Sequence, residues 1–310
     1  MHCVLLSNPA AGRLRHRRAE QIRQVAEALS ALGHRVEVIH TKAPGSATGQ
    51  AREAVRAGAE VVFACGGDGT MHEVLQGLVT EGVEPVASLG LIPLGSANAL
   101  ARQLHLSLDP VQAALQQIHG FPMIVPVGKL TLGGQCRYFT VMAGAGPDGA
   151  LVYNLCSARK SRLGRLVYYL QAAGVYATRR FPPFEVEFTD VVSGEIIHRS
   201  AAGLMAIRVE SLGGLFRGLA GSGAPLQQPQ LRLAILRPPA KLSLPLWFVS
   251  GWLGLLRFNP LIEFVEASVC VCRPLAGSAP HLEADGESLG RIPSVFSVVP
   301  RALRLLLPNR

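Results

Sequence analysis

Residues 66–70 combine three glycines, one carboxylate and one hydroxyl in the order Gly-Gly-Asp-Gly-Thr. The apolar run 61–65 before them is typical of a strand buried on both faces, and the run 71–78 after them has helical periodicity. Glycine lets the backbone turn tightly and bring its N–H groups close to a ligand. The start of a helix adds free N–H groups and a positive dipole end, which together bind anions. The stretch therefore predicts a phosphate site.

Asp68 lies in the middle of this predicted site. A carboxylate beside phosphate oxygens is repelled, because two unit charges about 4 Å apart interact by about 4 kcal/mol at an effective dielectric near 20. A Mg²⁺ ion between them, or a substrate hydroxyl hydrogen-bonded to Asp68, would remove the conflict. The alternative is that Asp68 caps the helix and the glycines only form a turn. The stretch matches neither the Walker pattern nor the dinucleotide fingerprint.

Strands alternate with helices over the first 122 residues, and this order predicts right-handed crossovers and a parallel sheet. We expect strands at 2–7, 35–40, 61–65 and 86–93, and helices that end near 32 or span 46–57, 71–78, 99–106 and 110–119. In such sheets ligands bind at the carboxyl ends of strands, so loops 8–13, 66–70 and 94–98 should share one edge. The polar and basic candidates in or beside the outer two loops are Asn8, Arg13, Ser96, Asn98 and Arg102. Each one alone is more typical of a cap or a turn residue, and only their shared edge favours a ligand.

From about residue 122 the pattern changes to short strands separated by Gly, Pro and Ser clusters. Strands are expected at 125–132, 137–143, 184–190, 195–199, 204–209, 231–236, 261–266, 268–272 and 294–299. We therefore predict a Rossmann-like parallel α/β domain at 1–122, followed by an antiparallel β-sandwich domain at 123–293. The C-terminal segment 294–310 is a candidate to pack back on the first domain.

Two helices are expected within the second domain. The helix 166–178 opens with the basic run 159–165, which suits phosphate or lipid headgroups but also suits a solvated helix start. The helix 244–258 is apolar nearly all round, so it either packs against the sandwich or contacts a bilayer surface.

The chain has a net charge of +9, and all but four of its 30 basic residues are arginine. Arginine suits phosphate contacts and anionic lipid headgroups. The alternative is a generically basic protein. The basic residues are dispersed and aromatics are few, so no nucleic-acid partner is predicted.

No run of about 18–20 apolar residues predicts a transmembrane helix, and the first residues resemble a strand rather than a signal peptide. The six cysteines lack zinc-site spacing and are interpreted as reduced. We expect a cytoplasmic protein in peripheral contact with an anionic membrane surface.

Taken together, the motifs resemble the diacylglycerol kinase catalytic-domain family, which includes bacterial lipid kinases and sphingosine kinases and is related to NAD kinase. Residues 66–74 are similar to its Gly-Gly-Asp-Gly-Thr-x-x-Glu-Val signature, and 8–12 to its first nucleotide loop. Residues 93–102 resemble its Pro-x-Gly-Thr-x-Asn-Asp-x-Ala-Arg stretch, and 285–287 match its late Asp-Gly-Glu. The resemblance implies a nucleotide domain plus a β-sandwich, with the active site between them.

The implied reaction transfers the γ-phosphoryl group of ATP, with Mg²⁺, to a lipid hydroxyl. Asp285 would be the general base and Glu287 would help to place Mg²⁺. Asp68 would hold Mg²⁺ or its water, although in the sphingosine kinase branch this aspartate is the proposed base. The residues that would contact the nucleotide or its phosphates are Asn8, Pro9, Gly12, Arg13, Gly66, Gly67, Gly69, Thr70, Ser96, Asn98, Arg102 and Lys160.

The chain departs from the family pattern at three places. Ala99 stands where many members have aspartate, and Pro126 lies near a position where bacterial members often carry one. Pro229 and Gln230 stand where an Asp-Gly usually precedes a strand, and that aspartate helps to bind an auxiliary Mg²⁺, so this metal is not predicted here. The alternatives are an NAD kinase-like enzyme with a soluble substrate and a catalytically weak nucleotide-binding membrane regulator. A homodimer stays open.

Overall fold

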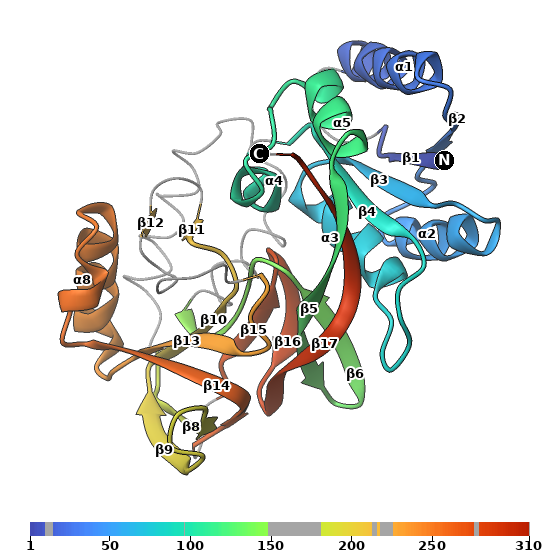
Figure 1. Cartoon of the computed structure of the whole chain (residues 1–310). Helices are drawn as coiled ribbons and strands as arrows, with labels where there is room; N and C mark the ends of the chain where they lie inside the picture. Colours follow the sequence, from blue (N-terminus) through green and yellow to red (C-terminus); the bar gives the residue numbers. More distant parts are fainter. Residues whose placement is uncertain are drawn as a thin grey trace. The chain divides into compact units, whose positions relative to one another are not determined.

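The computed structural model describes residues 1–9, 15–95, 97–147, 181–212, 216–217, 226–275 and 279–309. The chain forms two compact units, Met1–Val127 with Val299–Arg310, and Gly128–Val298. Strands β5 (Phe121–Leu132) and β17 (Ser294–Leu307) each have residues in both units (Figure 1). The domain limits expected at 122 and 293 fall inside or next to these strands, so no flexible linker marks them.

The first unit is built around a parallel sheet with the strand order β17–β4–β3–β1–β2. Its strands, besides the C-terminal part of β17, are β1 (His2–Ser7), β2 (Arg35–His40), β3 (Val61–Gly66) and β4 (Ser88–Pro93). Strands β3 and β4 are buried along their whole length, as expected for strands covered on both faces.

Helices cover both faces of this sheet (Figure 1). They are α1 (Arg15–Ala31), α2 (Ser46–Arg56), α3 (Asp68–Leu78), α4 (Ala99–Gln103) and α5 (Pro110–Ile118). Leu29 of α1 and Ala114 of α5 share a core with Phe63 of β3. Helices α2 and α3 pack against each other, and Gly77 permits this, since a Cβ there would lie 2.5 Å from the carbonyl oxygen of Thr48.

The second unit is antiparallel, with the order β16–β15–β7–β10–β13–β14–β17 and with the β8–β9 hairpin paired to β14. Its strands are β6 (Gln135–Phe139), β7 (Met142–Ala145), β8 (Phe184–Asp190), β9 (Ile196–Ala201), β10 (Gly203–Ile207), β13 (Leu231–Leu236), β14 (Ile262–Arg273), β15 (His281–Ala284) and β16 (Glu287–Arg291). Short strands β11 (Ser211–Leu212) and β12 (Phe216–Arg217) pair with each other. Phe139, Phe184, Phe188 and Phe296 anchor one buried core. The predicted fold class, a parallel α/β domain followed by an antiparallel β domain, is confirmed.

Several element limits differ from the expected ones. The strand expected at 137–143 is divided into β6 and β7, whereas the pair expected at 261–266 and 268–272 forms the single strand β14 with a bulge. The segments 294–299 and 302–307 are likewise one strand, β17, which passes through Arg301 at φ +50°.

The apolar helix of the second unit begins earlier than expected. Helix α8 spans Ala240–Trp252, and a separate 3-10 turn follows at Leu256–Phe258. Among the described residues, none of the helices combines the length and the apolar character needed to cross a membrane. The expected helix 166–178 and the basic run 159–165 lie outside the described residues.

Candidate functional site

Three strands of the first unit end at the same edge of its sheet. In the register, Ser7 of β1 is paired with Cys65 of β3, and Gly66 of β3 with Pro93 of β4. The loops after these strands therefore begin side by side, as the sequence predicts. Asn8 is half-buried and Pro9 exposed, while Gly12, Arg13 and Ser96 lie outside the described residues.

The loops after β3 and β4 contact each other backbone to backbone. A Cβ at Gly95 would lie 2.5 Å from the Cα of Gly67, and a Cβ at Gly67 would lie 3.2 Å from the Cα of Gly95. Gly66 is covered by the Thr70 side chain, whose Oγ1 would lie 2.4 Å from a Cβ. Glycine is thus required at these three positions by the approach of the two loops and of the first helical turn.

Gly69 is different, because a Cβ at this position would meet no heavy atom within 4 Å. It is the second residue of α3, and no left-handed backbone angle demands glycine there. A glycine inside a helix costs about 0.5–1 kcal/mol relative to alanine. Packing within the described residues does not explain Gly69, whereas close approach of a ligand to the N-terminus of the helix would.

Asp68 joins the two loops through its carboxylate. Its Oδ2 accepts the N–H of Asn98 at 3.0 Å, and its Oδ1 accepts the N–H of Ala99 at 2.7 Å. Asp68 is the first residue of α3 rather than part of a turn before it, because the helix begins earlier than expected. The N-cap of α3 is Gly67, not Asp68. The Asp68 carboxylate instead accepts the N–H groups of Asn98 and Ala99, which begin α4, so it caps a different helix from the one expected.

The Asn98 side chain is hydrogen-bonded to the backbone of its own loop. The side chain is buried, its Oδ1 accepts the N–H of Gly95 at 2.9 Å, and its Nδ2 donates to the Gly95 carbonyl at 2.9 Å. The residue adopts a left-handed conformation at φ +50°, which asparagine tolerates better than most residues. Asp68 and Asn98 together fix loop 94–98 against the start of α3.

Two arginine side chains donate hydrogen bonds to main-chain carbonyl groups of the same loop. Arg102, a predicted site residue, donates its Nε–H to the Ala97 carbonyl at 2.9 Å, and Arg18 of α1 donates to the Leu94 carbonyl at 2.7 Å. Arg18 is not among the residues predicted from the sequence. The signal in the sequence is the arginine-rich start of α1, which follows the loop that begins at Asn8.

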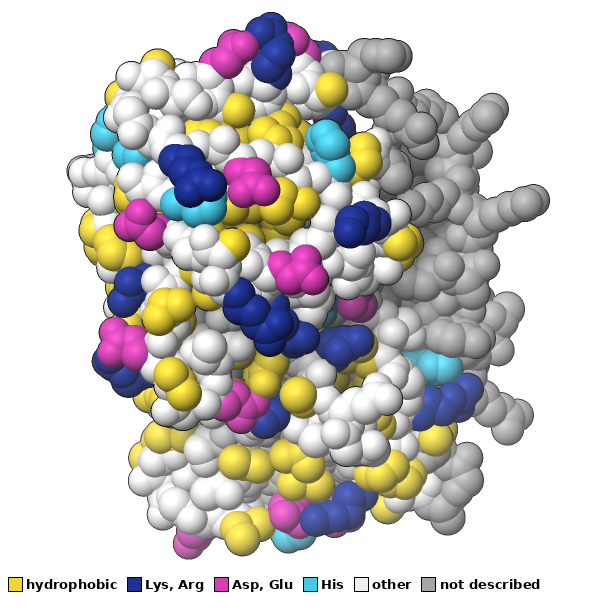
Figure 2. Space-filling model, turned by 90° about the vertical axis from the view of Figure 1, so that its right-hand side faces the viewer, with side chains coloured by type: hydrophobic (Ala, Val, Ile, Leu, Met, Phe, Trp, Pro, Cys, Tyr) yellow, Lys and Arg dark blue, Asp and Glu magenta, His cyan; other side chains and the backbone are white. Residues whose placement is uncertain are grey.

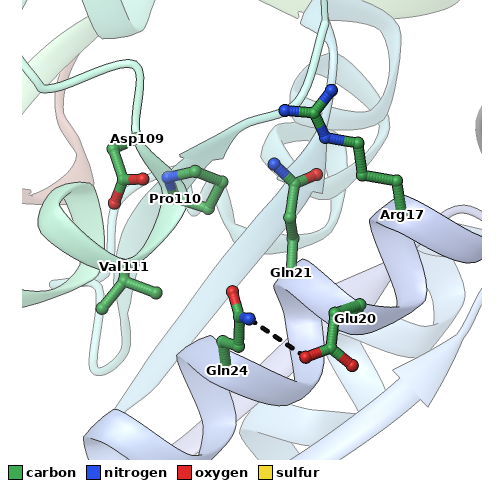
Figure 3. Close-up of a pocket in the computed structure, with 7 residues that line it drawn as sticks. All are labelled: Arg17, Glu20, Gln21, Gln24, Asp109, Pro110 and Val111. Carbon is green, nitrogen blue, oxygen red and sulfur yellow. Dashed lines mark hydrogen bonds between the residues drawn. The ribbon is translucent and has the colours of Figure 1, made fainter.

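The cavities among the described residues of the first unit include a smaller and a larger one. The smaller one, of about 20 Å³, is lined by Gly66, Gly67, Asp68 and Asn98 among others, and so belongs to the predicted site. The larger one, of about 290 Å³, lies between α1 and the start of α5 (Figure 3). None of the predicted site residues that the structure describes lines the larger cavity, and Glu20 and Gln24 within it are hydrogen-bonded to each other.

In the second unit, Asp285 and Gly286 form the two-residue turn between β15 and β16. Both have positive φ, +45° and +87°, as the commonest two-residue hairpin turn requires. Asp-Gly is typical of such a turn, so the dipeptide has a structural role here. It does not exclude a chemical role, because the turn presents the Asp285 carboxylate to a neighbouring segment. Glu287, the first residue of β16, is half-buried.

The Asp285 carboxylate is held by three successive main-chain N–H groups. Its Oδ2 accepts from Thr140 at 2.9 Å, and its Oδ1 accepts from Val141 at 3.0 Å and from Met142 at 2.9 Å. The N–H of Asp285 donates in turn to the Met142 carbonyl at 2.8 Å. These bonds explain why the strand expected at 137–143 is interrupted, since residues 140–142 turn their N–H groups toward the carboxylate.

Arg208 is a buried charge near this hairpin that the sequence analysis missed. It follows β10, is 1% exposed, and donates to carbonyl groups of the segment before β13. Burial lowers the pKa of the Arg208 guanidinium to about 10. The charge of the Asp285 carboxylate opposes this shift, because it raises the same pKa. A single arginine in the apolar run 203–209 is the one signal that the sequence offers, and it is weak.

Lys160 lies outside the described residues. Within the described part of the chain, no group of three or more His, Cys, Asp or Glu side chains is placed to hold a metal ion by itself. The described candidate residues thus form two separate groups, the loop junction around Asp68 in the first unit and the Asp285 hairpin in the second.

The chain is similar to diacylglycerol kinases in sequence and in fold. Residues 2–130 match the model of the diacylglycerol kinase catalytic domain. The chain is 32% identical over 195 residues to a diacylglycerol kinase of Bacillus subtilis, a match that covers 62% of each chain. It is 25% identical over 305 residues to a diacylglycerol kinase of Staphylococcus aureus, covering 98% of this chain and 92% of the relative. The matches to the first relatives span about three fifths of their length.

Solved structures show the same fold over the whole chain. A crystal structure of a diacylglycerol kinase from Bacillus anthracis superposes with a TM-score of 0.68 at 19% identity, covering 99% of this chain and 96% of that one. Another structure from the same strain gives a TM-score of 0.75 at 21% identity with the same coverage. At these identities the likeness establishes the fold.

Proposed function

We propose that this protein, whose residues 2–130 match the model of the diacylglycerol kinase catalytic domain, is an ATP-dependent lipid kinase. It would transfer the γ-phosphoryl group of ATP to a hydroxyl of a lipid such as diacylglycerol. The observation that carries the proposal is the junction of the two glycine loops, tied by Asp68 at the carboxyl edge of a parallel sheet. Ligands of open α/β sheets bind at this edge.

The nucleotide phosphates are assigned to the start of α3. The first turn of a helix has N–H groups without intrahelical acceptors, and they face the positive end of the helix dipole. Gly69 supports this assignment, since nothing in the described packing needs its missing side chain. Asp68 and Asn98 position loop 94–98, and Arg18 and Arg102 hold its carbonyl groups.

The site residues fit a magnesium ion that arrives with the nucleotide. Mg²⁺ is usually bound through one or two carboxylates plus substrate phosphates, and no dedicated cluster of ligands is needed. Asp68 in the first unit would offer carboxylate oxygens, the ligand type that Mg²⁺ prefers, and Glu287 in the second unit carries the same group. When bound, the ion neutralises charge on the transferring phosphoryl group.

We assign the acceptance of the lipid hydroxyl proton to Asp285. The N–H groups of Thr140, Val141 and Met142 fix the position and orientation of its carboxylate. A base that is already oriented avoids the entropic cost of finding its geometry in each turnover. Asp68 accepts two main-chain N–H bonds that join the loops, and this supports a positioning role for it.

Helix α8 is proposed to contact the membrane that carries the lipid substrate (orange in Figure 1). Leu242, Leu246 and Val249 on this helix and Leu253 directly after it are between 41% and 56% exposed. Their spacing of four, three and four residues places them on one helical face. A helix with such an apolar face can lie in the membrane interface.

Basic residues beside this face suit an anionic bilayer. Lys241 precedes the first exposed leucine, and Arg257 lies over the exposed ring of Phe258 at 4.6 Å from its centroid. On the face shown in Figure 2, by contrast, basic and acidic side chains are interspersed among hydrophobic ones. We therefore propose a local, peripheral contact through α8 and the turn after it.

An acceptor screen tests the proposed function. Purified protein is given radiolabelled ATP with diacylglycerol, sphingosine, phosphatidylglycerol or NAD, and label in each acceptor is measured. Transfer to diacylglycerol or another lipid alcohol is expected. Transfer to NAD alone would indicate a soluble-substrate kinase, and tight ATP binding without any transfer would indicate a regulator.

A further inference from the structure

Arg208 has the largest fully buried side chain among the described residues. A guanidinium in the interior is costly unless its donors are paired, because the ion loses its hydration. Its hydrogen-bond partners among the described residues are main-chain carbonyl groups. One terminal nitrogen donates to Gln230 at 3.2 Å and to Gln228 at 3.4 Å, and the other donates to Leu226 at 3.1 Å and to Gln228 at 3.3 Å.

These three carbonyl groups belong to one short segment, 226–230, that leads directly into β13. Converging carbonyl oxygens are the kind of ligand that a hard cation such as Mg²⁺ or Ca²⁺ takes in proteins. In this chain the cation at their centre is a side chain of the protein itself. Its charge is permanent at neutral pH, because the lowered pKa of the guanidinium is still about 10.

The same segment is where the family resemblance implies an auxiliary metal ion. The position that would supply its carboxylate is occupied by Pro229 and Gln230. The Gln230 side chain donates to Glu266 of β14 at 2.6 Å, and the carbonyl groups of the segment bind Arg208. The residues present therefore do not fit a divalent metal at this place.

Arg208 is also linked to the segment that holds Asp285. Its main-chain N–H donates to the Val141 carbonyl at 2.9 Å, and the Val141 N–H donates to the Asp285 carboxylate at 3.0 Å. A displacement of Arg208 is thus transmitted through one residue to the proposed base.

We propose that Arg208 is a built-in cation that replaces an auxiliary metal ion in this protein. Its guanidinium orders segment 226–230 and, through Val141, keeps the N–H groups of 140–142 in register with Asp285. The link to catalysis rests on the proposed function, whereas the replacement of the metal does not. Arg208 acts here as a positioning residue.

The first test measures thermal unfolding without nucleotide, in Mg²⁺ and in a chelator. The wild type is expected to give the same Tm in both, as is Arg199→Ala, a control that removes an exposed arginine bound to Glu263. Arg208→Ala should unfold at a lower temperature. A wild-type Tm that falls on chelation, or an Arg208→Ala variant as stable as the wild type, would overturn the proposal.

Chemical rescue distinguishes the effect of the missing guanidinium charge on the Tm from the effect of the lost side-chain packing. Guanidinium chloride at a low, non-denaturing concentration should raise the Tm of Arg208→Ala, and urea at the same concentration should not. Arg208→Lys keeps a charge but lacks the fork that reaches three carbonyl groups, so its Tm should lie between those of Arg208→Ala and the wild type. Lack of any guanidinium effect would contradict the proposal. If Arg208→Ala cannot be purified, a Tm of Arg208→Lys equal to that of the wild type would contradict the proposal.

The kinetic readout concerns the link to Asp285. Arg208→Ala should lower kcat by about 10²-fold, the cost of a misplacement of about 1 Å, with the KM for ATP unchanged. Guanidinium should restore part of kcat. A wild-type protein without kinase activity would refute the proposed function. The unfolding and rescue tests of Arg208 would remain valid, because they do not measure activity.

Discussion

Gly69→Ala should have opposite effects on stability and on nucleotide binding. Apart from its chain neighbours and its own helix backbone, the added methyl group meets no atom of the described residues within 4 Å, and the position lies in the first turn of α3. Alanine is favoured over glycine inside a helix by about 0.5–1 kcal/mol, so the protein without ligand should become more stable. For a domain of 150–250 residues, 1 kcal/mol corresponds to about 2–4 °C in Tm.

The same methyl group would stand where we place the phosphates of ATP. We expect ATP affinity to fall on the order of tenfold or more, and each tenfold corresponds to about 1.4 kcal/mol. Thermal unfolding without ligand and calorimetric titration with Mg²⁺ and ATP measure the two effects separately. A variant that is more stable and binds ATP as tightly as the wild type would refute the assignment of phosphate to this turn.

Two further glycines serve as controls. Gly49 lies in α2, also with no atom within 4 Å of a Cβ and without a left-handed backbone angle, so Gly49→Ala should give the same stabilisation and leave ATP affinity unchanged. In Gly95→Ala the new Cβ would lie 2.5 Å from the Cα of Gly67. This clash should destabilise the protein by about 1–3 kcal/mol, as overpacking typically does.

Three other variants test the remaining assignments. Asp285→Asn should retain ATP affinity but lower kcat on the order of 10²–10⁴-fold, the usual effect of losing a general base, and near-normal turnover in steady-state assays would remove Asp285 from this role. Asp68→Asn keeps one oxygen that accepts a main-chain N–H but places an NH₂ donor against the other N–H, so one hydrogen bond to a charged acceptor, worth about 1.5–3 kcal/mol, is lost. It should therefore weaken ATP binding in the same titration, and unchanged affinity would show that the loop junction is not part of the nucleotide site. Leu246→Asp should reduce flotation with anionic vesicles, whereas Val192→Asp, on the β8–β9 turn, should not, and equal flotation of all three proteins would exclude α8 as the contact.

The sequence predicts the first unit well, because its signals are local. The buried run 61–65 followed by Gly-Gly defines a strand and a turn without reference to any distant residue. The parallel order and the common edge of the loops then follow from general rules on crossovers. The same locality explains why the Asp285–Gly286 turn is recognisable.

The contacts that give the site its geometry are not local. Asp68 binds N–H groups 30 and 31 residues away, and Asp285 binds N–H groups 143 to 145 residues away. Nothing in the run 137–143 indicates that its backbone turns toward a carboxylate in a hairpin turn far along the chain. Arg208 is missed for a related reason, since arginine is mostly exposed and its burial depends on carbonyl groups about 20 residues later.

The most direct test of the central claim is the fate of the phosphoryl group itself. Diacylglycerol in anionic vesicles is incubated with the wild type and with ATP labelled at either the γ- or the α-phosphate, and label in the lipid fraction is measured. We predict that γ-labelled ATP labels the lipid, that α-labelled ATP does not, and that Asp285→Asn reduces the labelling strongly. An unlabelled lipid in the presence of bound ATP, or label transferred from the α-position, would contradict the account.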